Sequence, residues 1–281
     1  MVNILQRVGA IDRLQNAQKV CTAWREICKD PAMWRVVYMD RYSGGDGRLF
    51  CRDMCKHAVN RSQGQLVDLT IIGFCDNDLL QYVVDKSSQL RRLELVQYVH
   101  DFCEIWSEAF KKLPLLEELS LVETKIWKED IEAAGRYCPL LKTLKLNQRS
   151  QFWADSDDSM TVSIQNGIAL AIGKNLHELT HLELIGNSMK NIGLQAVLDG
   201  CCRLELLDLR RCLYVDLKGD LGKRCSQQIK YLKLPHDSLE GFPYTCYVLY
   251  DSDSDDEYLD YDDEYDGYSD YDDYTANDNV R

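Results

Sequence analysis

The chain has 281 residues, 45% of them hydrophobic, which is enough for a sizeable core and excludes a small protein that depends on disulfide staples. Its 33 lysines and arginines face 46 aspartates and glutamates, but residues 250–281 alone hold 14 of the acids and one of the bases. The first 249 residues therefore carry 32 acids and 32 bases and are neutral overall. Such a body lacks the basic excess of a general nucleic-acid binder, so we expect no nucleic-acid partner, and any electrostatic partner should be basic.

Cysteine usage and hydropathy indicate the compartment. The 12 cysteines are sparse for a chain of this length, which favours reduced thiols over a disulfide framework. Charges at Arg7, Asp12 and Arg13 interrupt the N-terminal segment, which therefore does not read as a secretory signal. No apolar run approaches the ~18 to 20 residues of a membrane-spanning helix. We expect a soluble protein of the nucleus or cytoplasm with no membrane partner.

A hexapeptide of the form L-x-x-L-x-L recurs seven times between residues 66 and 234. Successive copies begin 24, 26, 25, 38, 25 and 25 residues apart. One such hexapeptide is common by chance, but seven in near-constant phase indicate a repeating structural unit. The copies begin at Leu66, Leu90, Leu116, Leu141, Leu179, Leu204 and Ile229.

Each copy predicts a strand followed by a helix. The alternation in Leu93–Leu95 has the period of a strand with one buried face, and the residues after each strand have helical spacing. At the helix ends, Cys138 and Cys201 are expected to act as compact hydrophobes where the chain turns back into the next strand. One predicted helical stripe consists of Ile192, Leu194, Val197, Leu198 and Cys201.

This pattern resembles the cysteine-containing leucine-rich repeat from about Gln65 to Pro235. The resemblance implies an α/β fold, a right-handed horseshoe solenoid with parallel strands on its concave face. The alternative, an ordinary α/β sheet with helices on both faces, would not impose a constant period. The family's Asn or Cys after the last leucine is matched by Asn187 and Cys212, and by the hydroxyl of Thr124. In the other repeats this position is occupied by Phe74, Tyr98, Arg149 and Asp237. There we expect the ladder of hydrogen bonds that satisfies backbone groups to be irregular or water-filled.

Before the repeats, apolar residues at spacings of three and four predict short amphipathic helices, broken at Gly9 and Pro31. The stretch VCTAWREICKDPAMW, residues 20–34, resembles the second half of an F-box, with its V-C-x-x-W and D-P-x-x-W motifs. Residues 4–5 and 9–14 match the first half, where Asp12 is expected to cap a helix. Joined to the repeats, this motif is similar to the F-box/leucine-rich-repeat proteins of flowering plants. The resemblance implies that the adaptor SKP1 is bound by Ile4, Leu5, Ile11, Leu14, Val20, Cys21 and Trp24.

The alternative for this N-terminal segment is a helix pair that only seals the end of the solenoid. Two indoles and several aliphatic residues exceed what such a cap requires, which favours the F-box. The family's usual L-P-x-E-L start is not matched by residues 1–3, so the first helix is expected to be truncated. Either the sequence is shortened at its start or adaptor binding is weakened.

The sequence thus predicts four parts: a short all-α F-box at 1–40, a linker or capping segment at 41–64, seven repeats at 65–240, and a disordered acidic Asp/Tyr-rich tail at 250–281. The long fourth interval places an insertion near 148–160. Its Phe152 and Trp153 belong either to a tolerated surface loop or to an anchor above the concave face.

No residue pattern points to catalysis. Two groups containing cysteine lack the paired C-x-x-C spacing of a zinc site, so core packing is favoured for them over a metal site. None of the five histidines lies in a hydrolase motif, and no Gly-rich phosphate loop follows a strand. We therefore expect no enzyme, metal or cofactor. The two groups are Cys51, Cys55, His57 and Cys201, Cys202, Cys212.

Residues that flank the strand leucines should point away from the core and form the target-binding face. Arg210, Tyr231 and Lys233 are expected to lie together and to anchor a target, since arginine and tyrosine are frequent binding hot spots. Alternatively, this cluster holds the protein's own acidic tail. The predicted substrate-binding residues are Arg92, Glu94, Lys145, His181, Arg210, Tyr231 and Lys233.

The resemblance implies a non-catalytic substrate-recognition subunit of an SKP1-cullin-F-box ubiquitin ligase. SKP1, and through it cullin, would bind the F-box, and an unknown target protein marked for ubiquitination and degradation would bind the repeats. The alternative is an acidic-tailed leucine-rich-repeat scaffold that binds basic nuclear proteins without a ligase role.

Overall fold

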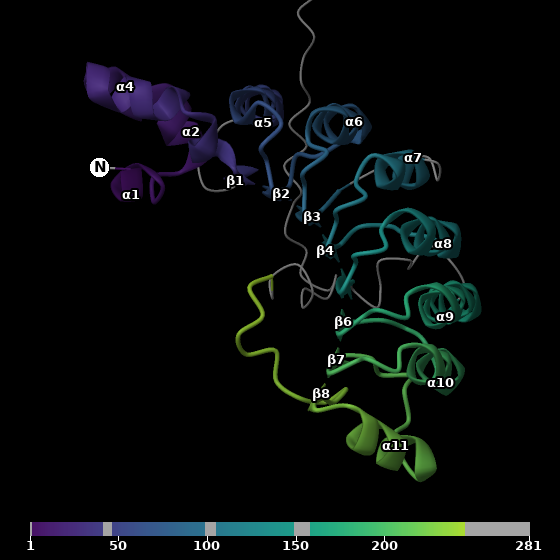
Figure 1. Ribbon diagram of the computed structural model, residues 1–281. Coiled ribbons are helices and arrows are strands. Elements are labelled where there is room, and N and C mark those ends of the chain that lie inside the picture. Colours follow the sequence, from purple (N-terminus) through teal and green to yellow (C-terminus); the bar gives the residue numbers. More distant parts are fainter. Residues whose placement is uncertain (1, 42–46, 99–104, 149–157, 245–281) are drawn as a thin grey trace, which may run out of the picture. The chain divides into compact units, whose positions relative to one another are not determined.

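The computed structural model describes residues 2–41, 47–98, 105–148 and 158–244 (Figure 1). The chain divides into two units, Met1–Leu249 and Tyr250–Arg281, and the first holds every described helix and strand. The predicted tail and the Phe152-Trp153 pair lie outside the described residues. Among the described residues no helix is both long and apolar enough to cross a bilayer.

The described residues form an eight-stranded sheet in which every strand pairs in parallel with the next one along the chain. This order, with a helix in each connection, confirms the predicted repeating α/β fold. The strands are β1 Val36–Asp40, β2 Asp68–Ile72, β3 Arg92–Val96, β4 Glu118–Val122, β5 Thr143–Asn147, β6 His181–Glu183, β7 Leu206–Asp208 and β8 Tyr231–Lys233.

The connecting helices lie along one face of the sheet, as Figure 1 shows. In α10 the predicted stripe is buried at Leu194, Val197 and Leu198, but the prediction is wrong for Ile192, which is exposed. The helices are α5 Arg48–Ser62, α6 Asn77–Lys86, α7 Ile105–Lys111, α8 Lys128–Tyr137, α9 Asp158–Asn175, α10 Asn191–Gly200 and α11 Asp220–Gln228.

The repeated leucines form the core between sheet and helices. Leu69, Leu93, Leu119 and Leu144 pair across four strands in direct register, and all are fully buried. Burial of each such side chain contributes roughly 1.5–3 kcal/mol. At the last copy Leu234 is exposed, because β8 is the final strand of the described sheet.

The first strand is one that the leucine pattern does not reveal. Val36 pairs with Asp68, which places Trp34, Val37 and Met39 in the row of the repeated leucines. All three side chains are buried. The sheet therefore begins inside the predicted F-box segment, and α5, within the predicted linker, packs Cys51 and Cys55 into the same core.

Two buried cysteines, Cys138 and Cys201, tie their coils to the previous ones. The thiol of Cys138 donates to the carbonyl of Leu113 at 3.5 Å, and the thiol of Cys201 donates to that of Leu176 at 3.5 Å. Burial raises the pKa of both thiols to about 12, so they stay protonated as donors. These cysteines are thus hydrogen-bonding groups as well as the compact hydrophobes that the sequence predicts.

The predicted ladder is irregular at two of its positions, where the buried rings of Phe74 and Tyr98 stand in place of the Asn or Cys. The hydroxyl of Tyr98 donates to the Asn77 side chain at 2.7 Å. Asp237 also has a defined partner there, since its carboxylate accepts from the Leu234 N–H at 2.8 Å. Arg149 lies outside the described residues.

Two glutamines continue the ladder toward Asn187. Gln148 donates to the Thr124 carbonyl at 3.0 Å, and Gln165 donates to Gln148 at 2.9 Å. Asn187 in turn donates to the Gln165 side chain at 2.5 Å. The chain of amides satisfies buried polar groups from one coil to the next.

Candidate functional site

Short helices form a unit ahead of the sheet. Each is too brief to be stable alone, so packing on the core holds the unit together. They are α1 Val2–Leu5, α2 Ala10–Asp12, η1 Arg13–Ala17, α3 Gln18–Val20, α4 Thr22–Lys29 and η2 Pro31–Trp34.

The two F-box-like motifs have local structural roles. Cys21 is the N-cap of α4, and its sulfur accepts from the Trp24 N–H at 3.5 Å. Asp30 caps η2 by accepting from the Ala32 N–H at 2.9 Å, with Pro31 at the first position of the turn. These caps set where α4 begins and where the chain turns toward β1.

Trp34 closes the second motif inside the core. Its indole N–H donates to the Cys28 carbonyl at 2.9 Å, and the guanidinium of Arg13 lies 4.7 Å from the ring centroid. The expected helix cap at Asp12 is wrong. Gly9 precedes α2, and Asp12 instead accepts from the Asn16 side chain at 2.9 Å within the following turn.

The predicted adaptor residues fall into two groups in the structure. Leu5 and Leu14 are buried in the body's core. Ile4 and Val20 are 60% and 64% exposed, and Cys21 is also exposed. Ile11 and Trp24 are partly buried. We call the five residues that reach the surface, Ile4, Ile11, Val20, Cys21 and Trp24, the outer helical face.

The open face of the sheet carries a second candidate site, centred on Arg92. Its guanidinium donates to Asp68 at 2.7 Å, to Thr70 at 3.1 Å and to Glu94 at 2.5 Å. Glu118 is 3.6 Å from the Arg92 Nε. This arrangement brings two of the predicted substrate-binding residues, Arg92 and Glu94, into one network.

Lys145 extends the network by one strand. Its ammonium lies 2.8 Å from Glu118. Burial alone would lower the pKa of Lys145, but the hydrogen bond to Glu118 and the charges of Glu183 and Glu94 raise it above its ordinary value. The charged network, defined as Asp68, Arg92, Glu94, Glu118, Lys145 and Glu183, therefore holds four carboxylates against two cations.

Toward β8, the predicted cluster is divided between surface and interior. Tyr231 and Lys233 are exposed, as is His181 farther along the face. Arg210 is only 3% exposed, held by bonds from its Nε and Nη2 to the carboxylate of Asp208. Lys233 lies 3.2 Å from the same carboxylate. The structure thus joins Arg210 and Lys233 through Asp208, a contact that strand patterning alone did not reveal.

A segment after β8 covers part of this face. We call residues Ser238–Tyr244 the strap; in Figure 1 it follows β8 on the side of the sheet opposite the helices. Leu239 and Phe242 of the strap are buried in one cluster, with Tyr244 packed against it. Sequence reasoning missed the strap, because a single irregular segment has no periodicity to detect. The cluster's other buried residues are Ile72, Val96 and Val122 of the strands and Ile185, which follows β6.

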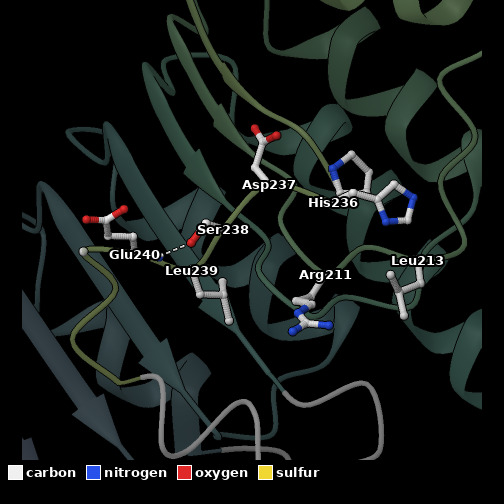
Figure 2. Close-up of a pocket in the computed structure, with 9 residues that line it drawn as sticks. Arg211, Leu213, His236, Asp237, Ser238, Leu239 and Glu240 are labelled. Atoms are coloured by element: carbon white, nitrogen blue, oxygen red, sulfur yellow. Dashed lines mark hydrogen bonds between the residues drawn. The ribbon is translucent and has the colours of Figure 1, made fainter.

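A hollow of about 520 Å³ lies beside the strap, and Figure 2 draws the side chains that line it. Arg211 and His236 line one side, and residues 238–241 line the other. The Glu240 N–H donates to the Ser238 hydroxyl at 3.1 Å, the dashed bond in the figure, and this bond stabilises the local turn.

The groups that the sequence raised as zinc candidates contain four buried cysteines, Cys51, Cys55, Cys201 and Cys212. Within the described residues no three His, Cys, Asp or Glu side chains are placed to hold a metal ion. Cys51 and Cys55 lie in the core with α5, and Cys201 and Cys212 donate their thiols to backbone carbonyls.

A parallel sheet built from strand-helix repeats, preceded by a helical unit with F-box-like motifs, defines an F-box protein with leucine-rich repeats. Residues 1–40 match the family model described as F-box-like. The chain is 45% identical to F-box protein SKIP19 of Arabidopsis thaliana, over 84% of this chain and 74% of that protein. It is 41% identical to F-box/LRR-repeat protein 21 of the same plant, over 86% and 81% respectively. The chain belongs to the plant F-box/LRR-repeat family.

Another relative is considerably longer. F-box/LRR-repeat protein 23 of Arabidopsis thaliana is 44% identical over 84% of this chain, but the match spans only 51% of that protein.

Proposed function

We propose that this protein is the substrate-recognition subunit of an SKP1-cullin-F-box ubiquitin ligase. The outer helical face binds an SKP1-type adaptor, and the open face of the sheet binds the target protein. The chain itself performs no chemistry; the ubiquitin-transferring subunits, recruited through the adaptor and cullin, do so.

The outer helical face is the observation that carries the adaptor role. The side chains of Leu5 and Leu14 are buried in the core, whereas those of Ile4 and Val20 are mostly exposed to solvent. Exposed aliphatic side chains in a unit this small are a cost that a partner would remove, at roughly 25 cal/mol per Å² of apolar surface buried. The family match over residues 1–40 covers these same residues.

The charged network supports a basic target. Its carboxylates outnumber its cations by four to two, and the Arg92 and Lys145 side chains are already paired within it. A lysine- or arginine-rich segment would complement the excess, whereas an acidic segment would meet like charge. Exposed Tyr38 on β1 and Tyr231 on β8 offer aromatic contacts at the two ends of the face.

Retention of purified SKP1 by the immobilised full chain tests the adaptor role. Val20→Glu places a charge on the outer helical face and should reduce retention at least tenfold. Leu49→Glu is the matched control, because Leu49 is 71% exposed on α5, outside the outer helical face, and should bind as the intact chain does. Leu14→Ala is unsuitable, since Leu14 is buried and its loss reports on stability.

Circular dichroism of each variant checks that the fold is retained. If the intact, folded chain retains no SKP1, the ligase role is wrong. If Val20→Glu and Leu49→Glu retain SKP1 equally well, the adaptor binds elsewhere on the chain.

A further inference from the structure

The open face of the sheet contains an apolar row. Ile72, Val96 and Val122 pair in register at the ends of β2, β3 and β4, and Ile185 follows β6 in the same cluster. These side chains point away from the helix-covered core, yet all four are buried. The strap contributes Leu239 and Phe242 to their cluster. The apolar row therefore already has an occupant from the chain's own sequence.

The strap presents two apolar side chains from a turn. The Phe242 N–H donates to the Leu239 carbonyl at 3.0 Å, and Gly241 adopts a φ of +77°, which favours glycine. The turn brings residues three apart in sequence into one cluster with the apolar row. Tyr244 packs against this cluster and hydrogen-bonds Glu94 of the charged network.

Arg210 holds the strap by its main chain. The Nη1 of Arg210 donates to the carbonyl of Ser238 at 2.9 Å and to that of Glu240 at 3.3 Å. The other edge of the guanidinium is fixed by Asp208, so the donating edge is set in position before any segment arrives. Carbonyl oxygens are present in every peptide, so this contact accepts a segment of different sequence.

Among the described residues, the strap is not one of the eight strands, and it contacts the open face of the sheet through side chains of the apolar row, Arg210 and Glu94. We propose that the apolar row and Arg210 form a peptide-binding groove, which the strap occupies and from which a target segment displaces it. This inference rests on the proposed target-recognition role and names the partner: a turn with an aliphatic and an aromatic residue three positions apart, followed by a hydrogen-bond donor that meets Glu94.

Binding of the strap sequence as a separate peptide tests this groove. The probe is fluorescently labelled HDSLEGFPY, residues 236–244, and fluorescence anisotropy measures its affinity for the full-length chain. A tethered segment competes at an effective concentration on the order of mM, so the intact chain should bind the probe weakly. The double variant Leu239→Ala with Phe242→Ala frees the groove and should bind it at least tenfold more tightly. A probe carrying the same two alanines should bind neither protein, and adding Val96→Asn to the double variant should abolish binding.

Three outcomes would overturn the proposal. A folded double variant that does not bind the probe shows that the groove takes no separate peptide. A double variant that fails to fold shows that the strap is part of the core. A concentration-dependent dimer of the intact chain that disappears in the double variant makes a second copy the occupant.

Hydrogen exchange on the intact chain provides a measurement that needs no variant. The Phe242 amide should exchange at least tenfold faster than the amides of β3, because the strap opens without the sheet. Exchange at the same rate would also overturn the proposal. Retention of SKP1 by the intact chain is the separate readout: its absence, while the double variant binds the probe, counts against the ligase role and not against the groove.

Discussion

Arg210 lies two residues after Asp208 and grips its carboxylate with two nitrogens, Nε at 2.9 Å from Oδ1 and Nη2 at 2.7 Å from Oδ2. Asp208 has no exposed surface at all. The pair is therefore internal, and the arginine contacts the chain's own backbone where the strand pattern predicted a residue open to a target.

Removing one partner of the Asp208–Arg210 pair should destabilise the folded chain. Asp208→Ala leaves a buried guanidinium without its counter-charge, and we expect a loss of about 3–5 kcal/mol in the free energy of unfolding, measured by urea denaturation. Replacing both partners with apolar residues, Asp208→Leu with Arg210→Met, should recover most of that loss. Asp68→Ala is the control: it removes a partner from the half-exposed Arg92 and should cost about 1 kcal/mol or less. Equal losses for Asp68→Ala and Asp208→Ala would contradict this account of the pair.

The two tryptophans of the F-box motifs should respond differently to truncation. Trp34→Ala removes a fully buried ring and should cost about 3–5 kcal/mol, seen as a lower thermal midpoint by circular dichroism. Trp34→Phe keeps most of the ring but leaves the Cys28 carbonyl without its donor, at about 1–3 kcal/mol. Trp24→Ala, on the outer helical face, should destabilise less than Trp34→Ala while reducing SKP1 retention. A Trp34→Ala protein that melts like the intact chain would show that the motif does not anchor the unit.

Two glycines of α9 form a matched pair. A Cβ on Gly173 would stand 2.1 Å from the Ala196 carbonyl of α10, so Gly173→Ala must push the two helices apart. We expect a loss of about 1–3 kcal/mol from such overpacking. A Cβ on Gly167 meets only the Lys128 side chain at 3.8 Å, so Gly167→Ala should gain roughly 0.5–1 kcal/mol from helix propensity. The midpoints of urea denaturation of both variants measure these changes in stability. Similar shifts for Gly173→Ala and Gly167→Ala would mean that α9 and α10 do not contact each other closely at Gly173.

Asp130 should give stability a pH dependence. Burial raises the pKa of this carboxyl to about 6 from its ordinary 3.8, against the hydrogen bond from the Trp127 N–H, and the charge of Glu129 adds to the rise. The folded chain thus holds a proton that the unfolded chain releases between these two values. The stabilisation from that proton is complete below the unfolded pKa and is lost as the pH rises through about 6.

Asp130→Asn isolates this effect, because its amide oxygen still accepts from the Trp127 N–H. The free energy of unfolding of the intact chain, relative to Asp130→Asn, should fall by about 1–3 kcal/mol between about pH 4 and pH 7. Urea titrations at several pH values measure it. A difference that is constant across this range would mean that Asp130 is not buried as described.

The strands and their order follow from sequence wherever leucine marks the buried positions. The seven copies of the hexapeptide identify β2 through β8, because the period-two alternation of a half-buried strand is local. β1 escapes this reasoning, since Trp34, Val37 and Met39 fill the same row without a leucine and lie 32 residues before their counterparts in β2. The signal that could have found it was the run of β-branched, aromatic and apolar residues, Val36–Met39, directly after the D-P-x-x-W motif.

The candidate site is less accessible to sequence reasoning than the strands are. Alternation correctly places Arg92, Glu94 and Lys145 on the open face. It cannot show that Ile72 and Val96 on that face are buried, because the strap that covers them lies about 140 to 170 residues away in sequence. Long-range contacts made by an irregular segment produce no periodic pattern in the sequence.

Trp34 is at once the last residue of the F-box motif and the first buried position of the sheet's opening row. In the described part of the chain, the helices before it and the repeats after it share one hydrophobic cluster, which joins the adaptor-binding and target-binding parts of the proposed ligase. A bound target would be held at a fixed offset from the ubiquitin-carrying enzyme. The position of the bound peptide along the sheet would then determine which of the target's lysines come within reach of the ubiquitin-carrying enzyme.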